Sequence, residues 1–128
     1  MNTAQIIAKY DLQPLPGEGG YFRRFYTHSR QLPGSASRLA SAIFFLITKD
    51  SFSAMHRLPS DELFHFYEGH AAEMLQLDPA GGGQIFRLGS EHERAVVVPG
   101  GVWQGMRLAE DAPEDAFALF GVSVHLSL

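Results

Sequence analysis

Three side chains that can bind a metal ion or transfer a proton lie close together between Met55 and Gly69, namely His56, Glu62 and His65. Apolar, strand-like residues surround them, and the stretch ends on a glycine suited to a turn. Imidazole and carboxylate groups serve as general acids and bases and also as metal ligands. We therefore expect the functional site here, but these residue types alone do not choose between the two kinds of chemistry.

Strand parity decides which of these side chains can share a pocket. Alternate residues of a strand point to the same face. A regular strand would place Glu62 on one face with Phe64 and Phe66, and His65 on the other. Only a bulge near Phe64 would bring His65 to the Glu62 side.

The same alternation applies to the strands on either side. It predicts that His56 shares a face with Phe52, Ala54 and Leu58. In a later strand, Gln104 shares a face with Met106, opposite Trp103. We therefore expect pocket-facing positions on three strands. The predicted ligand-binding residues are Gln104, Tyr21, Phe64, Phe66, Met106 and His65.

The elements that must hold these residues are mostly short strands. Asn2 and Gln5 form a capping-box pattern that predicts a short helix, ended by the proline-rich bend at residues 13–17. Apolar or alternating segments separated by turn residues then predict nine or ten strands. They cover residues 21–27, 41–48, 52–58, 62–68, 71–78, 84–88, 95–98, 102–108 and 116–128, with a loop from His28 to Arg38. The pattern is typical of an all-β sandwich or barrel.

Length and composition restrict the class of protein. A chain of 128 residues forms one domain, residues 1–128, with a single hydrophobic core. The net charge of −4 argues against nucleic-acid binding, and the absence of cysteine excludes disulfides and thiolate chemistry. No signal pattern and no membrane-length apolar run is present, so we expect a cytoplasmic protein without membrane contact.

Several motifs resemble those of a known family. His56, Glu62 and Gly69 are similar to the first motif of the cupin superfamily, His-x-His-x(3,4)-Glu-x(6)-Gly, and residues 99–104 to the second, Pro-x-Gly-x-x-His. The chain resembles most closely the small family called Cupin 5, through stretches that include Glu18-Gly19-Gly20-Tyr21-Phe22-Arg23, Ser60-Asp61-Glu62 and His65-Phe66-Tyr67. This resemblance implies an all-β, jelly-roll (double-stranded) β-barrel after a short N-terminal helix.

The chain departs from the general cupin pattern at two metal-ligand positions. Leu58 stands where the second histidine would be, and Gln104 where the histidine of the second motif would be. His56, Glu62 and Gln104 remain as weak candidate metal ligands, and an amide oxygen is a poor replacement for imidazole. The sequence therefore favours a metal-free pocket over a metal centre and leaves the cofactor open.

Three functions stay open. The first is an isomerase-like or epimerase-like pocket for a small polar, sugar-like metabolite, with His56 as base, Glu62 orienting it, and a tyrosine such as Tyr21 as acid. The second is a module that binds such a ligand without reaction, and the third is a metal-dependent oxygenase or isomerase. The aromatic content and the exposed edges of a small β-structure lead us to expect a homodimer.

Overall fold

The computed structural model describes residues 1–31, 33–34 and 38–125, and it begins with helix α1 (Thr3–Tyr10). The side-chain oxygen of Asn2 accepts the Gln5 backbone N–H, and the side-chain oxygen of Gln5 accepts the Asn2 backbone N–H. This pair confirms the predicted capping box. Asp11, in the left-handed conformation, ends the helix. Within the described ranges no helix has the length and apolar character needed to cross a membrane.

In the described residues ten strands follow the helix, and all except the two-residue β1, which falls in the predicted proline-rich bend, lie close to the predicted positions. They are β1 (Gln13–Pro14), β2 (Tyr21–Thr27), β3 (Ala40–Thr48), β4 (Ser53–His56), β5 (Asp61–Gly69), β6 (Ala72–Leu77), β7 (Gly83–Leu88), β8 (Ala95–Val98), β9 (Trp103–Leu108) and β10 (Phe117–His125). The predicted loop at His28–Arg38 and the end of the last strand extend partly outside the described residues. The all-β class with one short helix is confirmed.

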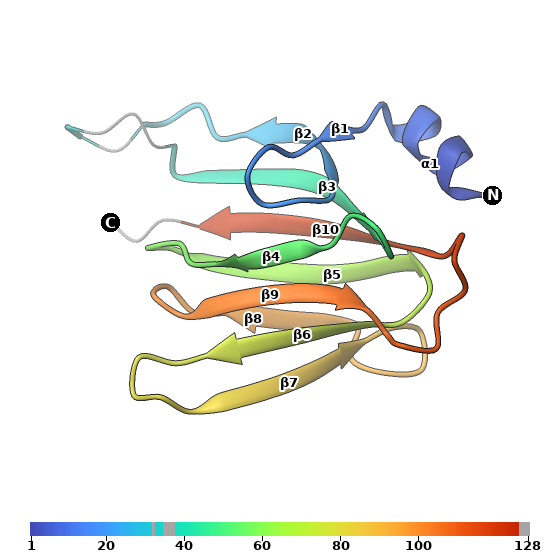
Figure 1. Ribbon diagram of the computed structural model, residues 1–128. Helices are drawn as coiled ribbons and strands as arrows, with labels where there is room; N and C mark the ends of the chain where they lie inside the picture. The colour runs from blue at the N-terminus through green and yellow to red at the C-terminus, as the bar shows by residue number, and fades with distance from the viewer. Residues whose placement is uncertain (32, 35–37, 126–128) are drawn as a thin grey trace.

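The strands form two antiparallel sheets that face each other. The larger sheet has the order β1-β2-β3-β10-β5-β8, and the smaller has the order β4-β9-β6-β7. In Figure 1 the strands of the smaller sheet lie in front of β10, β5 and β8. Neighbours in each sheet are mostly distant in sequence, as β10 between β3 and β5 shows. This arrangement is that of a jelly roll, as the resemblance implies, with two separate sheets in place of a closed barrel.

The main core fills the space between the sheets. Its centre is Phe120 on β10, which is fully buried and meets Phe64 and Phe66 edge-on at ring-centroid distances of 6.3 and 5.7 Å. Met74 and Met106 face these rings from the smaller sheet. The alternating burial along β5 and β9 agrees with the predicted parity, and it leaves His65 exposed on the outer face.

A second apolar cluster lies outside the larger sheet, where α1 covers the end of the sheet near β2 and β3 (Figure 1). Its buried members are Ile6, Leu12, Leu46 and Leu119. Tyr21 packs against this cluster beside its strand partner Leu46. The helix therefore stabilises the sheet that carries part of the site without reaching the inter-sheet space.

A bulge in β4 changes the predicted parity of this strand. Ser53 pairs with Met106 and His56 pairs with Gln104, so three residue steps on β4 oppose two on β9. The extra residue lets both Ser53 and His56 face inward, because a bulge reverses the alternation. The prediction that His56 shares a face with Phe52 is wrong for this reason, since Phe52 is largely exposed.

We predict that Phe120→Ala lowers the free energy of unfolding by about 3–5 kcal/mol, because it leaves a cavity between the sheets. Urea unfolding followed by circular dichroism measures the loss. Phe25→Ala is the matched control, since Phe25 is 44% exposed and only stacks on Phe44. A loss no greater than that of the control would contradict the described core.

Candidate functional site

The site is built around one amide group. The Nε2 of Gln104 on β9 donates to the Glu62 carboxylate at 2.7 Å and contacts the Nε2 of His56 at 2.9 Å. Gln104 is completely buried, and Glu62 is nearly so. His56 and Gln104 belong to the smaller sheet and Glu62 to the larger one. The amide therefore joins the two sheets as well as two ionisable side chains.

The hydrogen bonds of His56 determine its neutral tautomer. Its Nδ1 lies 2.8 Å from the backbone oxygen of Ala54, and a carbonyl oxygen can only accept. Nδ1 therefore carries the proton, and the lone pair of the neutral ring is on Nε2. The amide of Gln104 donates to that lone pair with one N–H and to Glu62 with the other.

Glu62 is an acid held in an apolar environment. Burial raises its pKa, while the charge of His56 and the hydrogen bond from Gln104 act in the opposite direction, and the Glu18 carboxylate adds to the rise. Desolvation is the largest of these effects because the side chain lies between the two sheets. Glu62 therefore holds a proton more firmly than an exposed glutamate.

A second carboxylate reaches the site from the loop between β1 and β2. Glu18 lies 3.9 Å from the Nε2 of His56, and its backbone oxygen accepts the Ala54 N–H at 2.7 Å. Gly19, with φ +90°, lets the loop press against the backbone of Phe52, where a Cβ would collide with the carbonyl oxygen. The loop is thus fixed to β4 beside His56.

These groups surround a small cavity of about 30 Å³. Polar side chains line one side and apolar ones the other; the lining is Leu15, Glu18, Ile43, Phe45, Ser53, His56, Glu62, Phe64 and Val122. The side chains of His56 and Glu18 are 18% and 39% exposed, so the cavity communicates with solvent. This volume exceeds the ~10–15 Å³ that a cavity needs in order to hold one water molecule.

The structure brings together only part of the predicted set. His56, Glu62 and Gln104 are in contact, and Phe64 lines the same cavity. Phe66 and Met106 face the same interior but belong to the core and do not line the cavity. The other two predicted ligand-binding residues point to the outer face of the larger sheet. Tyr21 packs in the cluster under α1, and His65 is exposed on β5.

Two polar residues near this site escaped the sequence analysis. Glu18 precedes a strand in a glycine-rich turn, and only the positive φ angles of the glycines place it at His56. Gln76 pairs with Gln104 in register, and its Nε2 donates to the Val97 oxygen on the larger sheet at 3.0 Å. Gln76 lies two residues after Met74 on a hydrophobic strand, so the alternation of faces could have predicted that its side chain points inward.

The placed side chains do not fit a metal ion. The Gln104 atom that contacts His56 and Glu62 is the amide nitrogen, which does not ligate metals, while its buried Oε1 has no hydrogen-bond partner among the described residues. In the described ranges no group of three or more His, Cys, Asp or Glu side chains is arranged to hold an ion. We therefore derive no chemistry through a metal.

The fold and the site define a small jelly-roll protein with a polar site between its two sheets. Comparison of the sequence with known protein families identifies the family. Residues 4–125 match the family Cupin 5, described as Cupin superfamily (DUF985). The chain belongs to this family. No curated protein matches the chain.

Solved structures show the same fold. A protein of Shewanella oneidensis is 26% identical with a TM-score of 0.87, over 100% of this chain and 80% of the other. A hypothetical protein from Leishmania major is 24% identical with a TM-score of 0.86, over 98% of this chain and 81% of the other. An oxalate decarboxylase of Bacillus subtilis is 19% identical with a TM-score of 0.64, over 90% of this chain and 27% of the enzyme. The last two likenesses show the fold alone.

We predict that Glu62→Gln stabilises the protein, and more so as the pH rises. The raised pKa means that the folded state binds the Glu62 proton more tightly than the unfolded state. The stability due to this proton is therefore fully present below the unfolded pKa and is lost as the pH rises through the folded pKa. Glutamine stays neutral and still accepts the Gln104 N–H.

Urea unfolding at a series of pH values from acidic to slightly alkaline measures this difference between variant and wild type. Glu68→Gln, an exposed position on the same strand, reports the general effect of removing one negative charge. If the gain in free energy of unfolding of Glu62→Gln over wild type became smaller as the pH rises, the result would contradict a raised pKa of the buried Glu62 carboxyl group.

Proposed function

We propose that the chain binds the reactive end of a small polar, uncharged metabolite in the cavity between the sheets. His56 then accepts a proton from this ligand in an isomerase-like or epimerase-like reaction. The observation that carries the proposal is the hydrogen bond from Nδ1 of His56 to the Ala54 oxygen. It directs the basic nitrogen of the ring toward Gln104 and Glu18, on the cavity side of the residue.

The surrounding charges support the role of His56 as a base. Accepting a proton turns the imidazole into an imidazolium cation. Glu18 lies 3.9 Å from the nitrogen that would receive this proton, and Glu62 is joined to it through Gln104. Two nearby carboxylates stabilise this cation. For His56 to act as a base, its Nε2 must also come within hydrogen-bond reach of the ligand proton.

The same charges select the class of ligand. Both ionisable acids of the cavity lie beside a ring that is neutral before the reaction, so a phosphate or carboxylate would be repelled there. Hydroxyl and carbonyl groups meet no such repulsion, and a hydroxyl donates readily to carboxylate oxygens. A neutral hydroxy or keto compound, of sugar-like character, is therefore the substrate class that the site favours.

One observation favours a binding module without catalysis as the second candidate. The lone pair of His56 Nε2 already accepts an N–H of Gln104 at 2.9 Å. A ligand must displace this amide before the ring can take its proton. If the amide stays in place, the pocket binds its ligand and leaves it unchanged.

We predict that His56→Ala abolishes proton abstraction while leaving ligand binding. Wild-type protein in D2O should exchange the proton next to the carbonyl of a neutral keto-sugar, as followed by proton NMR. A missing general base lowers this rate by at least ~100-fold. Ser53→Ala is the control, because it also lines the cavity but carries no base.

The same assay separates the alternatives. Binding of keto-sugars by wild type without exchange would leave only the binding module. Exchange that persists in His56→Ala would contradict the role of His56. Exchange or binding that appears only after addition of Mn, Fe, Ni or Zn salts would overturn the metal-free proposal in favour of a metal-dependent activity.

A further inference from the structure

The Glu18 carboxylate at the cavity has hydrogen-bonding capacity that the protein leaves unused. Its Oε2 lies 3.9 Å from the Nε2 of His56, which is beyond hydrogen-bond distance. Among the described residues no other group bonds to either side-chain oxygen of Glu18. A carboxylate accepts hydrogen bonds through both of its oxygens. Glu18 can therefore bind two donor groups of a ligand.

The loop between β1 and β2 holds this carboxylate in place before any ligand arrives. The backbone oxygen of Glu18 accepts the Ala54 N–H at 2.7 Å, and the Gly20 N–H donates to Oγ of Ser51 at 2.9 Å. The Leu15 N–H closes the loop by donating to the Gly20 oxygen at 2.9 Å. A group that is already ordered costs less conformational entropy on binding. The loop thus presents Glu18 as a preformed acceptor.

Glu18 lies at the outer end of the cavity. Its side chain is 39% exposed, whereas that of His56 is 18% exposed and Glu62 is buried. A ligand whose reactive carbon reaches His56 must therefore pass Glu18 as it extends toward solvent. The 3.9 Å between Glu18 and the basic nitrogen corresponds to about two or three carbon–carbon bonds. Substituents on the reactive carbon and on the next carbon are thus the ones that meet Glu18.

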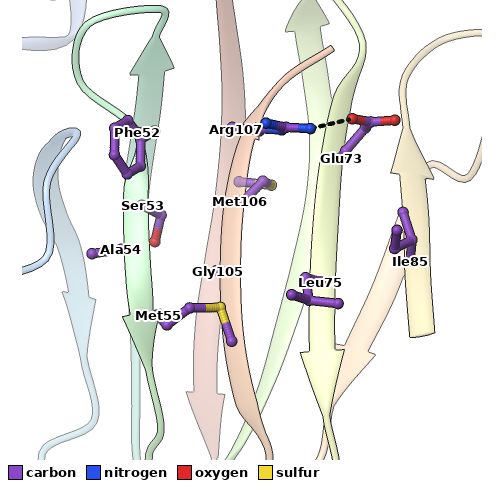
Figure 2. A pocket seen from close by; sticks show the side chains of 10 residues that line it. All are labelled: Phe52, Ser53, Ala54, Met55, Glu73, Leu75, Ile85, Gly105, Met106 and Arg107. Atoms are coloured by element: carbon purple, nitrogen blue, oxygen red, sulfur yellow. Dashed lines mark ion pairs between the residues drawn. The ribbon is translucent and has the colours of Figure 1, made fainter. Parts of the chain in front are cut away.

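A larger groove of about 300 Å³ on the outer face of the smaller sheet offers no comparable acceptor (Figure 2). Its lining is mostly apolar and includes Met55 and Leu75. The carboxylate there belongs to Glu73, and each of its oxygens faces an arginine, Arg87 at 3.8 Å and Arg107 at 3.7 Å. Of these two hollows, the cavity beside Glu18 is therefore the one suited to a ligand rich in hydroxyl groups.

We propose that Glu18 determines specificity for ligands with two adjacent hydroxyl groups, one on the reactive carbon and one on the next carbon. Each hydroxyl donates to one oxygen of the carboxylate. This inference rests on the proposed function, because that function places the reactive carbon at His56. A site built to hydrogen-bond a ligand hydroxyl rejects the analogue that lacks it, since the polar group of the site is then left unpaired.

A comparison of two ligands on wild type and Glu18→Ala tests the proposal. Erythrulose carries both hydroxyls, and its terminal deoxy analogue keeps the carbonyl and the exchangeable proton but lacks the outer hydroxyl. Wild type should exchange erythrulose in D2O with a kcat/KM ~10–100-fold above that of the analogue, because the lost bond ends on a charged group. In Glu18→Ala the two values should agree within about threefold, since the effect of the missing charge on His56 is common to both ligands and cancels in the ratio.

Glu68→Ala is the matched control, because it removes an exposed carboxylate outside the cavity and should keep the wild-type ratio. Far-UV circular dichroism checks that both variants fold. Equal rates for the two ligands in wild type, or a preference that persists in Glu18→Ala, would overturn the role of Glu18 and leave the proposed reaction standing.

Calorimetric dissociation constants for the same ligands separate the two proposals in the other direction. If wild type binds erythrulose without exchange, the reaction at His56 is contradicted. The role of Glu18 then requires erythrulose to bind ~10–100-fold more tightly than the analogue in wild type, but not in Glu18→Ala. Absence of binding by both ligands would contradict both proposals.

Discussion

The bond from Gln104 to Glu62 is the polar contact on which the site depends. It crosses from β9 of the smaller sheet to β5 of the larger one and ends on a carboxylate that burial has desolvated. Burying an ionised or polar group is tolerated only when a partner satisfies it. Because the same amide nitrogen also contacts His56, one side chain sets the spacing of the sheets and the position of the candidate base.

A second glutamine repeats this arrangement one strand away. Gln76 lies opposite Gln104 in the pairing of β6 with β9, and it donates to the backbone of β8 in the larger sheet. The two amides make one end of the inter-sheet space polar, whereas Phe120 and its neighbours keep the rest apolar. The cavity lies at this polar end, where hydrogen-bonding groups and apolar walls meet.

Strand periodicity and turn residues were enough to predict the class of fold, the capped helix and the faces of β5 and β9. Glu62, Phe64 and Gln104 were placed correctly because those parts of their strands are regular. His56 faces the pocket as expected, but Phe52 was wrongly assigned to the same face, because a bulge depends on pairing with a distant strand, which the local pattern does not contain. Glu18 was missed for a related reason, since the conformation of its glycine loop brings it to the site.

The role of His56 depends on a ring that carries its proton on Nδ1 and directs the lone pair of Nε2 toward Gln104. Two-bond proton–nitrogen correlation spectra of 15N-labelled protein report the tautomer directly, with the His56 signals identified by their loss in His56→Ala. At a pH where the ring is neutral, we predict a protonated Nδ1 and an unprotonated Nε2. The opposite tautomer, with the proton on Nε2, would contradict both the hydrogen-bond network and the role of His56 as a base.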